Sequence, residues 1–201
     1  MTKVITIAPR FLIKNTFAHP IQVRQNSDPR PLAIVKPGQR KPIRYLSSGD
    51  RLQLRIATEA PEGLLTWSAP FNISDIGRTN VTLRRQTSRG EKTYLMRVET
   101  HLQGSSIFLI VARETEPWPI KLRNNTSLPF KFKQMRNPDD GGDPSVFVER
   151  ELKPEDTVDY TWDWPTAREK LIQLTTGNLT LPRPIDIMAI GTQPPIKIPV
   201  S

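Results

Sequence analysis

The sequence contains no cysteine and only two histidines, His19 and His101, among its 201 residues. The absence of cysteine excludes disulfide scaffolds, cysteine zinc fingers and thiol catalysis, and it is typical of a cytosolic protein. Two histidines leave little for an imidazole metal site or a catalytic triad. There is also no P-loop, glycine-rich dinucleotide turn or Ser-His-Asp order. We therefore expect no metal site, no cofactor and no enzymatic activity.

Long hydrophobic runs are also missing. The longest apolar stretches, such as residues 107–112, fall far short of the roughly 20 residues that a membrane-spanning helix needs. The residues after Met1 do not form the charged and apolar segments of a secretory signal. The sequence thus predicts a cytoplasmic protein, and its 20 prolines argue against long helices.

Short apolar or alternating runs recur between proline, glycine and aspartate breaks. Such runs at about 8–12 residue spacing are typical of β-sandwiches and barrels. Only residues 166–171, after Pro165, resemble a helical turn. We predict an all-β fold with strands within residues 4–8, 11–14, 21–24, 52–56, 81–85, 94–98, 107–112, 120–122, 130–132, 146–148 and 170–174.

An internal repeat divides the chain. Residues 11–25 align without a gap with residues 120–134, at an offset of 109 that places Asn15 over Asn124. Two further blocks follow in the same order, 35–37 over 152–154 and 70–77 over 184–191. The repeat predicts two tandem β-sandwich modules from a repeat array. The first module is expected over residues 3–114 and the second over residues 115–201.

The two repeats differ in length. About 35 residues follow Gly77 in the first module before the linker, whereas ten residues follow Gly191. Either the chain belongs to a longer repeat array, or residues 92–112 pair into the second module and complete it. Both interpretations leave an unpaired sheet edge.

Asn15 and Asn124 each follow a predicted strand and precede a turn that contains a proline five residues further on. An asparagine in this position can bond the backbone of its own turn. We predict that both asparagines close a turn; the alternative is direct contact with a ligand.

Aromatic and basic residues could each carry a binding function. Trp118, Trp162 and Trp164 cluster in the second module. Their side chains could fill the core or form a platform that binds a peptide. The net charge of +9 suits acidic partners, including anionic lipid. No nucleic-acid-binding motif is present, so we expect no nucleic-acid partner.

Four blocks of the sequence together resemble a known family. They are residues 4–15, 117–124, 162–165 and 185–191. The combination is similar to the adaptor-binding (VAB) domain of the chorein-type vacuolar protein sorting lipid-transfer proteins. That resemblance implies tandem β-modules, six in the family, each with an asparagine where this chain has Asn15 and Asn124. The tryptophan-proline block resembles the last two modules.

The resemblance also implies a function. It predicts a targeting module that binds proline-x-proline (PxP) motifs in organelle adaptor proteins. Through them the parent lipid-transfer chain would be recruited to organelle membranes and contact sites, as a peripheral membrane association. The alternatives are a basic β-module that binds lipid surfaces and a structural spacer in a repeat array.

The residues that contact the peptide do not follow from the resemblance. An extended peptide can add to an exposed sheet edge while pockets bind its side chains. We expect it on the second module, or at the junction with the first, because the strands that would follow Gly191 are missing. Phe147 breaks the apolar alternation of its segment and is the apolar residue best placed for a ligand. The predicted contact residues are Phe130, Phe132, Val146, Phe147 and Trp164.

Overall fold

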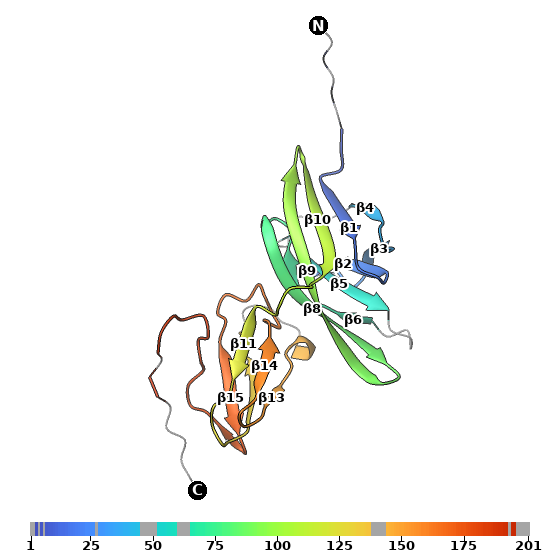
Figure 1. Cartoon of the computed structure of the whole chain (residues 1–201). Coiled ribbons are helices and arrows are strands. Elements are labelled where there is room, and N and C mark those ends of the chain that lie inside the picture. The colour runs from blue at the N-terminus through green and yellow to red at the C-terminus, as the bar shows by residue number, and fades with distance from the viewer. Residues whose placement is uncertain are drawn as a thin grey trace. The chain divides into compact units, whose positions relative to one another are not determined.

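The computed structural model describes residues 3, 5, 7–26, 28–44, 52–59, 65–137, 144–192 and 194–195. These residues form strands and one short 3-10 helix, η2 (Pro144–Val146), with no α-helix among them (Figure 1). The all-β prediction is confirmed. Nothing in the described ranges forms a helix able to cross a membrane. The chain divides into two compact units, Met1–Pro117 (unit 1) and Trp118–Ser201 (unit 2).

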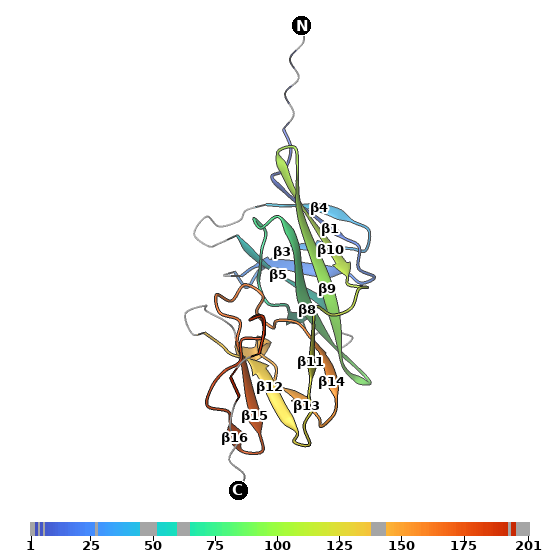
Figure 2. The same ribbon diagram turned by 60° about the vertical axis from the view of Figure 1, so that its left-hand side comes forward.

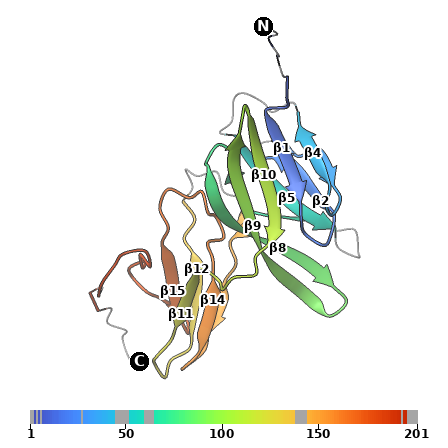
Figure 3. The same cartoon turned by 45° about the horizontal axis from the view of Figure 1, so that its top comes forward.

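Unit 1 is a sandwich of two sheets. One sheet has the order β4-β1-β10-β9-β8, and Figures 2 and 3 show these strands side by side. The other has the order β3-β2-β5-β6, with β7 also paired to β5. The strands are β1 (Phe11–Asn15), β2 (Ile21–Gln25), β3 (Pro31–Val35), β4 (Arg40–Ile43), β5 (Gln53–Glu59), β6 (Leu65–Trp67), β7 (Phe71–Asn72), β8 (Gly77–Thr87), β9 (Gly90–Gln103) and β10 (Ser106–Arg113).

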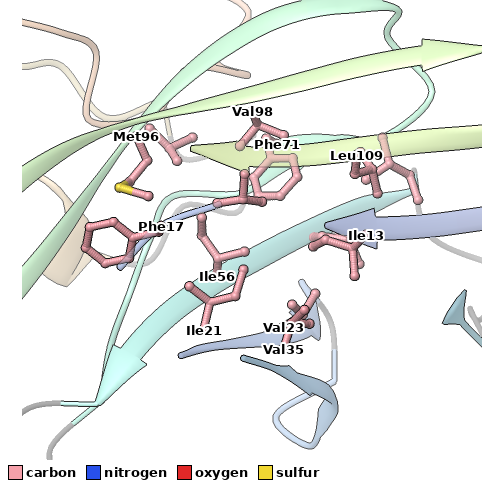
Figure 4. Packing of buried hydrophobic residues seen from close by; sticks show 14 of the residues in the cluster. Ile13, Phe17, Ile21, Val23, Val35, Ile56, Phe71, Met96, Val98 and Leu109 are labelled. Atoms are coloured by element: carbon pink, nitrogen blue, oxygen red, sulfur yellow. The ribbon is translucent and has the colours of Figure 1, made fainter. Parts of the chain in front are cut away.

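Alternation places one face of each sheet in the core of unit 1. In β1 and β2 every second side chain is buried, as a strand with one face on the core requires. Figure 4 shows Ile13 of β1 and Leu109 of β10 on one side, and Ile21 and Ile56 of the opposite sheet on the other. The core therefore combines strands far apart in the sequence.

Unit 2 contains a four-stranded sheet of order β13-β12-β15-β16 and a two-stranded sheet, β11-β14 (Figure 2). The strands are β11 (Ile120–Arg123), β12 (Phe130–Gln134), β13 (Arg150–Leu152), β14 (Thr157–Tyr160), β15 (Ile172–Thr176) and β16 (Leu179–Thr180). Their shared core contains Phe130, Phe132, Leu152, Tyr160, Trp162, Ile172 and Leu181.

Unit 2 reproduces the first seven strands of unit 1. The β11/β14 pair matches β1/β4, with the same register at the repeat offsets. The order β13-β12-β15-β16 matches β3-β2-β5-β6, and an isolated bridge between Ile172 and Ile185 stands where β5 pairs with β7. Among the described residues, β8, β9 and β10 have no counterpart in unit 2. The sequence left open whether residues 92–112 pair within the first module or complete the second. They lie in the sheet of unit 1.

Three local predictions fail. Residues 5, 7 and 8 form no strand, while Val4 and Thr6 lie outside the described residues. Residues 146–148 are not a strand, because η2 ends at Val146 and the Val148 N–H donates to the Asp163 carboxylate at 3.3 Å. Residues 166–171 contain no helix: a single turn after Pro165, in which the Ala167 N–H donates to the Trp164 carbonyl at 3.1 Å, is not continued.

Candidate functional site

Strand β1 of unit 1 has a neighbour on each edge, β4 on one side and β10 on the other. Toward β10, the Thr16 N–H donates to the Val111 carbonyl at 2.8 Å, and the Ile107 N–H donates to the Arg10 carbonyl at 2.7 Å. Backbone groups of alternate residues point to opposite edges of a strand. The even-numbered residues from 10 to 16 thus bond β10.

Strand β11, the counterpart of β1, has only β14 as a partner among the described residues. The Asn124 N–H donates to the Asp156 carbonyl at 2.9 Å, so the even-numbered residues of this strand bond toward β14. The backbone N–H and C=O groups of Lys121 and Arg123 therefore point to the opposite edge. We call this the open edge of β11. An edge with unpaired backbone groups is a template for another strand.

Apolar side chains adjoin the open edge. Ile120 and Leu122 are half-buried and pack against the core of unit 2 from β11. Their counterparts in β1, Phe11 and Ile13, are 6% and 0% exposed. Ile13 is covered because β10 continues the sheet, whereas no described strand does so beside Leu122. A strand added to β11 would bury further apolar surface as well as pair its backbone.

Asn124 fixes the turn that follows β11. Its side-chain amide donates to the carbonyls of Leu128 at 2.8 Å and Lys153 at 3.0 Å, and its Oδ1 accepts the Thr126 N–H at 3.0 Å. The side chain is buried, as is that of Asn15 at the equivalent place in unit 1. Asn124 thus holds the end of β11 to the neighbouring strand connection.

The structure separates the five predicted contact residues. Phe130 and Phe132 point from β12 into the core, and Val146 is buried in η2. Trp164 is also buried, while Phe147 alone is half-buried. Four of the five therefore offer little surface to a ligand in this conformation.

Phe147 and Trp164 do come together. Their rings stack with centroids 5.9 Å apart and an interplanar angle of 11°. Phe147 borders a cavity of about 490 Å³. Lys133 and Thr175 of the lining alternate with the core residues Phe132 and Leu174, so this cavity lies on the outer face of the four-stranded sheet. The cavity is lined by Lys133, Gln134, Met135, Arg136, Pro144, Phe147, Gln173, Thr175 and Thr180.

A buried ion pair supports the segment that carries Phe147. Arg150 donates to both oxygens of Asp163, at 2.9 and 2.6 Å, and its guanidinium lies over the Tyr160 ring at 5.2 Å. Burial and the nearby Asp163 carboxylate raise the pKa of the Tyr160 hydroxyl. Sequence reasoning missed this pair; the signal was an aspartate between two tryptophans that are both buried.

In the part of the chain that the structure describes, no three His, Asp or Glu side chains gather closely enough to ligate an ion.

The fold defines a tandem β-sandwich repeat protein, and the first strand of its second unit has one partner among the described residues. A family model described as "Vacuolar-sorting associated protein 13, adaptor binding domain" matches residues 1–169. The chain belongs to this VPS13 adaptor-binding domain family, which confirms the family resemblance found in the sequence.

Three relatives are similar over most of this chain. It is 33% identical over 204 aligned residues to the intermembrane lipid transfer protein VPS13 of Chaetomium thermophilum, covering 98% of this chain and 6% of the relative. It is 24% identical to vps13E of Dictyostelium discoideum and to human VPS13D, over 88% and 82% of this chain. In each of those two cases the chain spans 4% of the relative.

Proposed function

We propose that this chain is the adaptor-binding part of an intermembrane lipid transfer protein, and that it binds PxP peptides of organelle adaptors along the open edge of β11. Such binding recruits the parent lipid-transfer chain to organelle membranes and contact sites. The observation that carries the proposal is the edge itself: β1 is paired on both sides, and β11 has one partner among the described residues.

The backbone of a PxP motif suits this edge. In an extended strand, residues i and i+2 direct their N–H groups to the same side. In a PxP motif the two missing N–H groups are therefore both on the same side of the peptide strand. We place that side away from β11. The middle residue keeps its N–H and C=O for the backbone of Lys121 or Arg123. Proline is tolerated on an edge strand for the same reason.

The direction of the peptide determines which side chains it buries. In an antiparallel pair, the middle residue stands opposite Lys121 or Arg123, and both prolines lie on the inner face beside Ile120 and Leu122. In a parallel pair like β1/β10, the middle residue points inward instead. The motif specifies its prolines and leaves the middle residue open. We therefore propose the antiparallel arrangement.

The cavity beside Phe147 is a competing place for the same peptide. The Phe147 ring forms part of the cavity wall, and aromatic-lined grooves bind proline-rich segments in other proteins. In that arrangement Phe147 contacts the prolines and Trp164 supports its ring from behind. Phe130, Phe132 and Val146 support the site from the core. The two places can be separated by substitution.

The experiment removes one backbone donor from the open edge. Lys121→Pro deletes an N–H that points away from β14, so the β11/β14 pairing remains. Asp159→Pro is the matched control, because it deletes an outward N–H from the far edge of β14. Pro42 already occupies the equivalent place in β4. Both variants also remove the weak Lys121–Asp159 ion pair of 4.0 Å.

Affinity for a fluorescent PxP peptide is the readout. Lys121→Pro should weaken binding about fivefold or more, since a lost hydrogen bond costs about 1 kcal/mol, and Asp159→Pro should not. Phe147→Asp should leave affinity nearly unchanged if the edge is the site. Leu128→Asp is the matched control for Phe147→Asp. If Phe147→Asp loses binding while Leu128→Asp and Lys121→Pro bind like the parent, the cavity is the peptide site and the edge is not. No binding by the parent chain would refute PxP recognition itself.

A further inference from the structure

The β8–β9 hairpin of unit 1 extends past its sheet. Strand β10 pairs with β9 only from Met96 to Gln103, whereas β8 pairs with β9 as far as the Thr87–Gly90 turn. Figure 3 shows the hairpin as an arm that reaches beyond the other strands of unit 1. The arm therefore has no β10 neighbour along residues 90–95.

Two cations stand opposite each other on this arm. Arg85 of β8 is the cross-strand partner of Lys92 of β9. Like charges in directly opposed positions destabilise a hairpin. The next inward pair on the same face, Leu83 and Tyr94, is buried, so Arg85 and Lys92 continue the core-side face of the arm. The fold retains a repulsive pair where an apolar or opposite-charge pair would stabilise it.

Further cations surround Tyr94. The Lys92 ammonium lies 5.3 Å from the centroid of the Tyr94 ring, and the Arg113 guanidinium carbon lies 5.8 Å from it. Phe17 packs edge-on against the same ring at 5.3 Å. Tyr94 itself is 7% exposed, so the ring is a fixed support, while Lys92 and Arg113 are exposed.

A histidine completes the group. One terminal nitrogen of Arg85 lies 3.2 Å from Nε2 of His19, and the buried Nε of Arg85 has no hydrogen-bond partner among the described residues. Burial, with the charges of Arg85 and Lys92, lowers the pKa of His19. Within the described ranges, His19, Arg85, Lys92 and Arg113 form no ion pair with a carboxylate. Positive charge is thus collected here with no carboxylate partner among the described side chains.

We propose that His19, Arg85, Lys92 and Arg113 form a binding site for the phosphorylated headgroup of a membrane lipid. A phosphate offers several acceptor oxygens and more than one negative charge, which matches a guanidinium group beside further cations. Bound phosphate relieves the repulsion between Arg85 and Lys92.

A membrane lipid, rather than a phosphopeptide, fits the position of the cluster. Arg85 and Lys92 belong to a projecting arm whose turn adds the exposed Arg89, and Lys92 and Arg113 are exposed as well, so several cations can face an anionic surface together. Basic residues near an anionic membrane each add to binding. The site would act beside adaptor recognition, because two weak attachments on one chain raise the overall avidity.

The test uses the 201-residue chain and vesicles without any adaptor. Phosphatidylcholine vesicles containing a phosphatidylinositol bisphosphate are compared with phosphatidylserine vesicles of equal surface charge. We expect the parent to co-sediment with the first set in preference. Arg85→Gln with Lys92→Gln should weaken that binding about twenty-five-fold, at about fivefold for each cation lost near the surface. Lys3→Gln with Lys153→Gln removes the same charge elsewhere and should have a much smaller effect.

Folding of the cluster variant is checked by its melting temperature, which should rise because the repulsive pair is gone. Soluble inositol trisphosphate should compete with the vesicles. Equal binding to phosphatidylserine vesicles, or equal loss in the two double variants, would overturn the proposal. So would binding of the soluble headgroup or a phosphopeptide without binding of vesicles. Because no adaptor is present, these outcomes are independent of PxP recognition.

Discussion

Asn15 and Asn124 make the same hydrogen bonds at equivalent places in the two units. The Asn15 amide donates to the carbonyls of His19 and Val35, each at 2.9 Å, and the Asn124 amide donates to Leu128 at 2.8 Å in the place of His19. Each side-chain oxygen accepts the N–H two residues on. Both residues thus fasten the end of the first strand of a unit to two other segments.

Replacing either asparagine should destabilise its own unit. Asn124→Ala leaves buried carbonyls and an amide without their partner, which costs about 1–3 kcal/mol. Asn15→Ala should do the same in unit 1. Urea unfolding followed by tryptophan fluorescence measures the loss. If both variants unfold like the parent and lose only adaptor affinity, the asparagines are contact residues instead.

Chemical changes in the peptide test its direction on β11. Replacing either proline with alanine should weaken binding more than replacing the middle residue, because the antiparallel arrangement places both prolines beside Ile120 and Leu122. N-methylation of the middle residue should also weaken binding, since its N–H faces β11. Isothermal titration calorimetry gives the affinities. A peptide whose N-methylated form binds unchanged does not pair with a strand edge.

The ion pair between Arg150 and Asp163 should be important for the stability of unit 2. Asp163 is buried, so Asp163→Asn leaves the Arg150 guanidinium without its charge partner at a cost of about 3 kcal/mol. Asp159→Asn, in an exposed pair, should cost less than about 0.5 kcal/mol. Chemical denaturation compares the two. Similar small losses would show that Asp163 contributes by shape alone.

His19 should make unit 1 less stable in acid. Burial and the charges of Arg85 on β8 and Lys92 on β9 lower the pKa of His19 in the folded state below the value of about 6.5 that an unperturbed histidine has. The unfolded chain therefore binds the proton more readily, and the stability present above this value is lost as pH falls through the folded pKa. The melting temperature of His19→Gln should vary less with pH over that range than that of the parent.

Local patterning predicted much of the fold. The alternation of Leu128, Phe130 and Phe132 predicted one core-facing set: Phe130 and Phe132 are buried, whereas Leu128, which precedes β12, is exposed. The offset of 109 matched two strands of the first unit, β1 and β2, with β11 and β12 of the second. These features are encoded within a few neighbouring residues or in a direct comparison of two segments.

Long-range pairing could not be predicted in the same way. Nothing near residues 11–15 or 106–113 indicates that β1 and β10 lie parallel, because alternation defines the faces of a strand and not its neighbours. The open edge of β11 becomes visible only by comparison with that pair. Likewise, His19 and Arg85 are 66 residues apart, and their contact depends on the full sandwich.

The parallel pairing of β1 and β10 has a mechanical consequence. β1 enters the pair beside Ile107, and β10 leaves it beyond Val111, at the opposite end. Tension applied through Arg10 and Glu114 therefore acts along the two strands in opposite directions. It loads their hydrogen bonds together as a shear and does not open them one by one from an end. A module built in this way can transmit a pulling force along the chain without unravelling from its first strand.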